Sequence, residues 1–220
     1  MAELIGGLTV ERVRANLVEV RARIAAAAVR AGRDAACVEL VVAGKYVALE
    51  DLAVLAEAGI EVVGENRAQD LRAKVAAYGN TFTWDFIGHL QSRKVKDVAP
   101  LVRLIHSVST DSVLEQLARH ASPGLRVLVQ VDVAGEADKS GIAPRDLDGF
   151  LERCPLPVVG LTTMAPRTDE PGDSRRWFAA LRELAERHGL AELSMGTTQD
   201  YEVAVEEGAT LVRIGTRLFE

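Results

Sequence analysis

Cysteine is scarce in this 220-residue sequence, which contains only Cys37 and Cys154. The two thiols share no spacing typical of a metal or redox site, so they fit buried thiols in a reducing, cytoplasmic compartment. Long apolar runs are also missing, and the N-terminus lacks a basic segment followed by an apolar one. The sequence therefore predicts neither a signal peptide nor a membrane span.

Positive charge is sparse as well. Lysine and arginine total 26 against 32 acidic residues, and 26 − 32 gives a formal net charge of −6 with no long basic run. A protein that binds the phosphate backbone of nucleic acid needs a clustered basic face, so we expect no nucleic acid partner. No linker rich in Pro, Gly or Ser divides the chain, which predicts a single domain over residues 1–220.

The first pattern along the chain is helical. From Thr9 to about Arg30, apolar residues recur at intervals of three and four, at Val13, Leu17, Val20, Ile24 and Ala27. This spacing places them on one face of a helix, and Thr9 is a suitable N-cap. We expect residues 1–35 to form an N-terminal helix that packs on the rest of the domain.

After this helix, strand-like and helical patterns alternate. The strand-like runs are 39–45, 61–66, 83–89, 104–110, 126–133, 158–164, 193–196 and 211–216. The helical patterns between them are 49–58, 67–78, 91–98, 111–121, 144–153, 173–188 and 199–207. Such alternation is typical of parallel strands with right-handed crossovers, and eight units are the number that closes a barrel. The sequence predicts an α/β fold, a single (β/α)8 TIM barrel, with a short or missing last helix.

The first strand-like run ends in a lysine. If residues 39–45 are one strand, Lys45 shares a face with Val41 and Ala43. Burial disfavours the charged form and lowers a lysine pKa from about 10.4, and a neutral amine can attack an aldehyde to form a Schiff base. A lysine at a strand end can equally reach solvent or pair with a carboxylate, and this segment alone does not decide between the two.

Polar residues collect where the strands end, which is where a TIM barrel has its active site. They are Lys45, Glu65, Asn66, His89, Ser107, Ser109, Asp132, Thr163, Ser194, Arg213 and Thr216. In the last strand, Val212 and Ile214 would face the outer helices, which leaves Arg213 on the barrel side. Its guanidinium cannot shed its charge and needs an acceptor there.

The segments after the last two strands predict a phosphate site. Gly215 and Thr216 follow Arg213, and Ser194 to Thr198 bring hydroxyls and a glycine to the neighbouring strand end. Single residues at the strand ends also have simpler explanations. Gly215 can be a turn, Asn66 or Thr198 can be a helix cap, and His89 can be a core histidine. Together with the lysine, they indicate a ligand with a phosphate, an aldehyde and an acceptor for the arginine. Pyridoxal 5'-phosphate (PLP) has all three.

At this point the sequence resembles the pyridoxal phosphate homeostasis protein family. The matching segments are Val42–Lys45, Gly64–Gln69, Phe86–Ser92, His106–Val108, Lys139–Gly141, Gly160–Met164, Leu193–Gly196 and Val212–Thr216. They run in order through most of the chain. The resemblance implies a single barrel similar to the N-terminal domain of alanine racemase (fold type III), and proteins of this family are regarded as carriers or regulators of the vitamin B6 pool.

The resemblance also implies roles for single residues. Lys45 would be the catalytic, Schiff-base lysine, Arg213 would face the pyridine nitrogen, and Asn66 would lie beside the ring. The expected cofactor-binding set is Lys45, Asn66, His89, Ser194, Met195, Thr198, Arg213, Gly215 and Thr216. The sequence departs from the family at Gly44 and Tyr46, at Arg93, and at Thr197–Thr198, so the phosphate contact is open.

The resulting hypothesis is a PLP-binding protein that stores the cofactor or delivers it to apo PLP-dependent enzymes, and acts as a monomer. A PLP-dependent amino-acid racemase is the alternative, but two-base racemisation needs an acid or base on each face of the imine. Alanine racemases draw one from a second, β-rich domain that this chain lacks. A lysine-dependent aldolase without cofactor and an interaction module are further alternatives.

Overall fold

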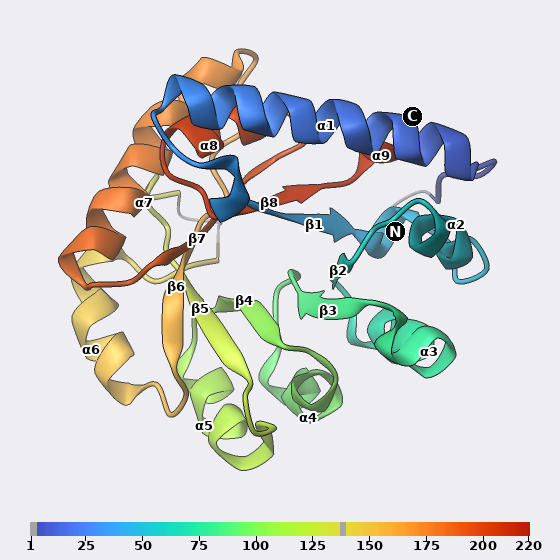
Figure 1. Ribbon diagram of the computed structural model, residues 1–220. Coiled ribbons are helices and arrows are strands. Elements are labelled where there is room, and N and C mark those ends of the chain that lie inside the picture. The colour runs from blue at the N-terminus through green and yellow to red at the C-terminus, as the bar shows by residue number, and fades with distance from the viewer. Residues whose placement is uncertain (1–3, 137–139) are drawn as a thin grey trace.

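Eight parallel strands close into a barrel in the computed structural model (Figure 1). They are β1 (Glu39–Ala43), β2 (Val62–Glu65), β3 (Thr83–Phe86), β4 (Leu104–Val108), β5 (Arg126–Gln130), β6 (Val158–Thr162), β7 (Glu192–Thr197) and β8 (Leu211–Ile214). Each strand pairs with the next, and β8 closes the ring on β1 with Arg213 opposite Val41. The predicted (β/α)8 barrel is confirmed.

Helices connect successive strands and form the outer layer (Figure 1). They are α2 (Leu52–Glu57), α3 (Ala68–Tyr78), α4 (Val95–Val98), α5 (Asp111–His120), α6 (Leu147–Arg153), α7 (Arg175–Arg187), α8 (Tyr201–Glu206) and α9 (Thr216–Phe219). The final helix, α9, is a single turn, as the sequence predicts. Thr110 caps α5 by accepting a hydrogen bond from the Val113 amide.

The extra helix, α1 (Val10–Arg30), lies across the outside of the barrel against α8 and α9 (Figure 1). The Thr9 hydroxyl accepts a hydrogen bond from the Arg12 amide at its start, as expected for an N-cap. The five apolar residues that predict the helix are all buried. Each large side chain that is fully buried in this way contributes about 1.5–3 kcal/mol to folding, which explains why the helix stays on the barrel.

Strand alternation separates the barrel interior from the layer beneath the helices. Val41, Leu104 and Leu211 belong to a small apolar cluster inside the ring. Val42 and Ile214 lie in the large core between strands and helices. The alternation therefore places Arg213 inside the barrel, between its outward-facing neighbours, as predicted.

All strands except β7 end earlier than the sequence predicts, and the prediction that Lys45 belongs to the first strand is wrong. β1 ends at Ala43, and Gly44–Tyr46 form a 3-10 turn that closes when the Val47 amide donates to the Gly44 carbonyl at 2.9 Å. Lys45 therefore reaches the barrel mouth from a turn and not from the pleat of a strand. Similarly, Thr216 begins α9, and His89 lies beyond β3.

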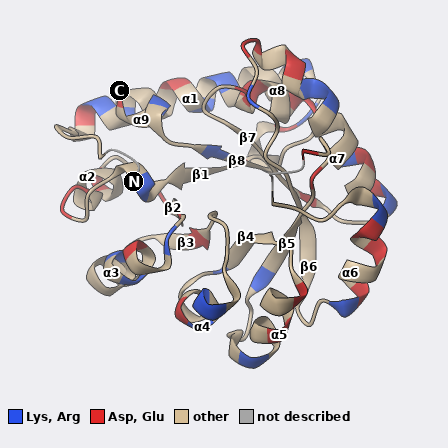
Figure 2. Ribbon diagram, turned by 180° about the vertical axis from the view of Figure 1, so that it is seen from behind, with Lys and Arg blue, Asp and Glu red and all other residues tan. Residues whose placement is uncertain are grey.

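The structure describes residues 4–136 and 140–220, so Lys139 of the Lys139–Gly141 motif lies outside the described residues. Over these two ranges, no helix is both long and apolar enough to cross a bilayer. Basic and acidic residues are interspersed along the outer helices (Figure 2).

Candidate functional site

A cavity of about 730 Å³ opens at the C-terminal ends of the strands. Six of the nine residues predicted to bind the cofactor line it, namely Lys45, Asn66, Thr198, Arg213, Gly215 and Thr216. They come from four separate βα loops and strand ends, so the barrel topology brings together residues that are up to 171 positions apart (216 − 45). The other three, His89, Ser194 and Met195, do not line this cavity.

Lys45 is half-buried at the wall of the cavity. Its Nζ lies 4.8 Å from the centroid of the Tyr46 ring. Among the described residues, no carboxylate forms an ion pair with it. The amine is thus less buried than the interpretation of an inward-facing strand lysine implies, and of the alternative only the access to solvent remains, not the pairing with a carboxylate. The amine has space in front of it.

Arg213 is buried, with 7% of its surface exposed, and its hydrogen-bond acceptors are all neutral. Nη1 donates to the Thr162 hydroxyl at 3.0 Å and to the Ser194 carbonyl at 2.8 Å, and Nη2 donates to the Thr163 carbonyl at 3.0 Å and the Met164 sulfur at 3.1 Å. Burial lowers the pKa of Arg213 to about 10. The guanidinium thus stays charged at neutral pH and carries its charge to the cavity wall.

Ser194 lies deeper in the barrel than the sequence predicts. Its hydroxyl accepts a hydrogen bond from Arg213 and lies 2.8 Å from Nδ1 of His106. The other ring nitrogen of His106 lies 3.2 Å from the Asp85 carboxylate. Burial lowers the pKa of His106, so the ring is neutral. Because Asp85 can only accept while ionised, Nε2 carries the proton and the Ser194 hydroxyl donates to Nδ1.

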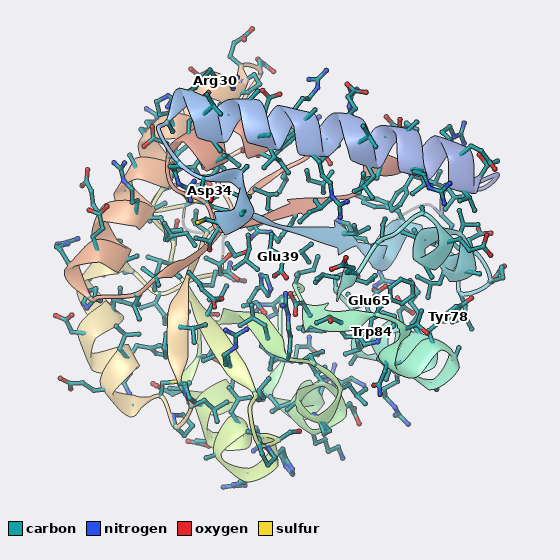
Figure 3. The ribbon with its side chains drawn as sticks, in the orientation of Figure 1. Arg30, Asp34, Glu39, Glu65, Tyr78 and Trp84 are labelled. Carbon is teal, nitrogen blue, oxygen red and sulfur yellow. The ribbon has the colours of Figure 1, made fainter. Side chains whose placement is uncertain are left out.

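Asp85 extends this chain of contacts toward the opposite end of the barrel. Burial opposes ionisation of Asp85, but hydrogen bonds from His106 and then Arg103 keep its pKa below the usual value. Arg103 donates to Asp85 at 2.9 Å and also binds Glu39. Figure 3 shows Glu39 within the ring of strands. A line of polar groups therefore runs through the barrel from the cavity wall at Arg213 to the N-terminal ends of the strands.

Two residues predicted to bind the cofactor, Met195 and His89, lie outside the cavity. The side chain of Met195 is fully buried in the core outside the barrel, because β7 alternates and points Ser194 inward. His89 is exposed and lies 3.2 Å from the Ser140 hydroxyl, outside the cavity. It is not the satisfied core histidine of the simpler interpretation either. Neither side chain is part of the cavity wall.

One side of the cavity combines hydroxyls with a tightly packed glycine. The Thr198 hydroxyl accepts from the Gly215 amide at 3.3 Å, and Thr216 lies beside them. A Cβ on Gly215 would lie 2.7 Å from the Tyr46 ring, so any other residue would force the ring to move. The neighbouring Thr197 hydroxyl donates to the Asp200 carboxylate at 3.2 Å. Of the two threonines, only Thr198 therefore has its hydroxyl at the Gly215 amide. Thr198 is not the N-cap of α8, because Asp200 occupies that position.

Asn66 stands at another side of the cavity. It does not cap α3, whose N-cap is Arg67. Its Oδ1 is buried and has no hydrogen-bond partner in the described part of the chain. Buried polar atoms are nearly always paired in folded proteins. An orphaned acceptor at a cavity wall is therefore typical of a residue whose partner is a ligand.

Sequence reasoning missed several residues of the site. Tyr46 counted only as a departure from the family, yet its ring forms cavity wall between Lys45 and Gly215. Met164 holds Arg213 through its sulfur. No local pattern marks these roles, since each depends on a contact between residues far apart in the chain or on the position of a turn.

The chain matches known proteins over most of its length. The alanine racemase N-terminal domain family matches residues 10–220. Proteins named pyridoxal phosphate homeostasis protein are 40% identical in Aquifex aeolicus (93% of this chain, 96% of the relative) and 39% identical in Pseudomonas aeruginosa (93% of each).

Solved structures agree with these sequence matches. PipY of Synechococcus elongatus, whose structure has PLP bound, superposes with a TM-score of 0.79 at 28% identity, over 94% of this chain and 100% of PipY. An alanine racemase from Corynebacterium glutamicum has a TM-score of 0.70 at 14% identity, over 98% of this chain and 63% of the racemase. At that identity the racemase supports the fold alone.

Proposed function

Because this chain belongs to the alanine racemase N-terminal domain family, and within it to the pyridoxal phosphate homeostasis proteins, we propose that it binds PLP and serves in PLP homeostasis. Lys45 holds the aldehyde as a Schiff base, and the protein stores the cofactor or passes it on. The main observation behind this proposal is that the Lys45 amine and the Arg213 guanidinium line one cavity. Neither is paired with a carboxylate among the described residues.

The residues present fit this cofactor. The orphaned Oδ1 of Asn66 offers an acceptor, and the absence of a side chain at Gly215 lets the Tyr46 ring pack against this part of the cavity wall. Thr198, Gly215 and Thr216 form the side that we assign to the phosphate. Arg213 is the residue that we assign to the pyridine nitrogen, as the family resemblance implies.

PLP supplies an electron sink for carbanion chemistry, and it does so best when its ring nitrogen is protonated. The charged guanidinium of Arg213 disfavours a proton on a neighbouring nitrogen, since a like charge moves such a pKa down by about 1–3 units. Its hydrogen bonds to two carbonyls and three side chains hold that charge in place. These contacts support a carrier that holds PLP without strong turnover.

The remaining aspects of the proposal concern the surroundings of the protein. We place it in the cytoplasm as a monomer that hands PLP to apo-enzymes. Both cysteines are free, which suits a reducing compartment, but Cys37 is exposed and Cys154 half-buried, so the prediction of buried thiols is wrong. Basic and acidic residues are interspersed along the outer helices in Figure 2, and we expect no nucleic acid partner.

Borohydride trapping tests the proposal. The purified protein is saturated with PLP, its visible absorbance is recorded, and the adduct is reduced and located by peptide mass spectrometry. We expect a yellow protein with the pyridoxyl group on the peptide that contains Lys45. Modification mainly at Lys94, Lys96 or Lys139 would contradict the assignment, and a colourless protein would contradict PLP binding itself.

A further inference from the structure

A second lysine, Lys74 on α3, is buried behind the cavity. Its side chain is 7% exposed and its Nζ has three acceptors. They are the Gly44 carbonyl at 2.8 Å, the Val47 carbonyl at 2.8 Å and the Glu65 carboxylate at 2.6 Å. An ammonium has three protons, so this set satisfies Lys74 completely. A buried lysine with all its donors used has no proton to offer a ligand.

The two carbonyls belong to the turn that carries Lys45. Gly44 precedes Lys45, and Val47 follows Tyr46, so Lys74 binds the turn at both ends. The Gly44 carbonyl also accepts the Val47 amide, which closes the turn itself. A single ammonium therefore ties the backbone on either side of Lys45 to α3.

Lys45 has alternative places to point, which makes the position of its backbone matter. It lines the main cavity and also a smaller one of about 240 Å³, whose wall includes Asn66 and Lys74. A long side chain at the boundary of two cavities can turn its amine into either. The orientation of the turn decides how often the amine faces the main cavity.

Glu65 holds the ammonium in place. It is the last residue of β2, it is fully buried, and Figure 3 shows it at the end of that strand toward α3. A Cβ on Gly44 would lie 2.5 Å from its Oε1, so the absence of a side chain there leaves room for the carboxylate. The glycine that departs from the family pattern is thus part of the same arrangement.

We propose that Lys74 is a positioning residue for Lys45: it fixes the Gly44–Val47 turn so that the Lys45 amine faces the main cavity. The inference rests on the proposed function, because its consequence is the rate at which PLP attaches to Lys45. Lys74 itself does not line the main cavity. Misplacement of a reacting group by about 1 Å can slow a reaction by about a hundredfold.

The test compares two ligands on the same variants. PLP needs Lys45 for attachment, whereas 4-deoxypyridoxine 5'-phosphate has the ring and phosphate but no aldehyde. In Lys74→Met we expect PLP attachment, followed by visible absorbance, to slow by about ten- to a hundredfold. Binding of the deoxy analogue should change less than about threefold. Lys96→Met removes an exposed lysine from the neighbouring helix and should change neither value.

The double variant Lys74→Met/Glu65→Gln guards against misfolding, because removing both charges avoids leaving Glu65 buried and unpaired. It should attach PLP as slowly as the single variant and still bind the analogue. Equal loss of both ligands would mean a general structural role and would overturn the inference, as would wild-type attachment rates in either variant. If the wild-type protein itself formed no adduct at Lys45, the proposed function would fail instead.

Discussion

The two ends of the barrel differ in whether the charged side chains inside the barrel and at its cavity form ion pairs. At the N-terminal end, Arg103 binds both Asp85 and Glu39, and Arg126 pairs with Glu192 at 2.8 Å. At the C-terminal end, Lys45 and Arg213 have no carboxylate partner among the described residues. Paired charges therefore close the N-terminal end of the barrel. At the other end the unpaired Lys45 and Arg213 line the cavity, and the buried Lys74–Glu65 pair lies behind it.

This difference separates stability from function. A buried ion pair is costly to break, since the remaining charge has no partner. In contrast, a positive charge whose hydrogen-bond acceptors are all neutral is not neutralised by the protein, so it can still attract an anionic or electron-rich ligand. Ser194, His106 and Asp85 join the two ends, so the cavity wall is anchored to the paired charges below it.

The largest expected effect lies at the N-terminal end. Arg103→Met leaves the fully buried Asp85 with His106 as its remaining partner, so we expect a loss of about 3 kcal/mol in the free energy of unfolding. Arg126→Met is the matched control, because its pair is more exposed and should contribute no more than about 1 kcal/mol. Urea unfolding measures both. Equal losses would show that burial of the Arg103 cluster does not matter.

A change at the C-terminal end should affect the ligand more than the fold. In Gly215→Ala the new Cβ would lie 2.7 Å from the Tyr46 ring, which must move within the cavity wall. We expect PLP affinity to fall about tenfold, or about 1.4 kcal/mol, and the free energy of unfolding to fall by about 1 kcal/mol. Equilibrium titration and urea unfolding give the two values.

Gly6→Ala is the control for that experiment, since nothing lies within 4 Å of its Cβ position. It should leave affinity and stability unchanged. An unchanged affinity in Gly215→Ala would mean that the Tyr46 side of the cavity does not contact the ligand.

The smallest effect concerns His106, which joins the two ends. Its pKa in the folded protein is lowered by burial from about 6.5. The histidine therefore binds a proton more readily in the unfolded chain than in the folded one. As a result, the free energy of unfolding falls as the pH drops below about 6.5, by at most about 1.4 kcal/mol per pH unit. In His106→Gln this part of the pH dependence should disappear. Urea unfolding of the PLP-free wild type and of the PLP-free variant between pH 7 and 5 measures it. If the free energy of unfolding changed with pH by the same amount in both proteins, the neutral buried histidine would be contradicted.

The sequence predicted what depends on local alternation and failed where distant contacts decide. The strand count follows from the alternation of strand-like and helical runs, and the inward direction of Arg213 follows from the two-residue period of a strand; both are correct. Ser194 was expected at the phosphate, but its hydroxyl lies between His106 and Arg213, 88 and 19 positions away. The role of Lys74 depends on carbonyls 30 and 27 positions away. No spacing in the sequence marks such contacts.

Thermal unfolding with and without PLP tests the contrast between the two ends most directly. A saturating ligand at a hundredfold excess over Kd stabilises by about 2.7 kcal/mol, a rise in Tm of about 5–10 °C for a chain of this size. We expect Lys45→Met to keep the PLP-free Tm of the wild type and lose most of this rise. Arg103→Met should lower the PLP-free Tm by about 6–12 °C and keep the rise. A large loss of PLP-free stability in Lys45→Met, or a lost PLP response in Arg103→Met, would contradict the separation of stability and ligand binding between the two ends.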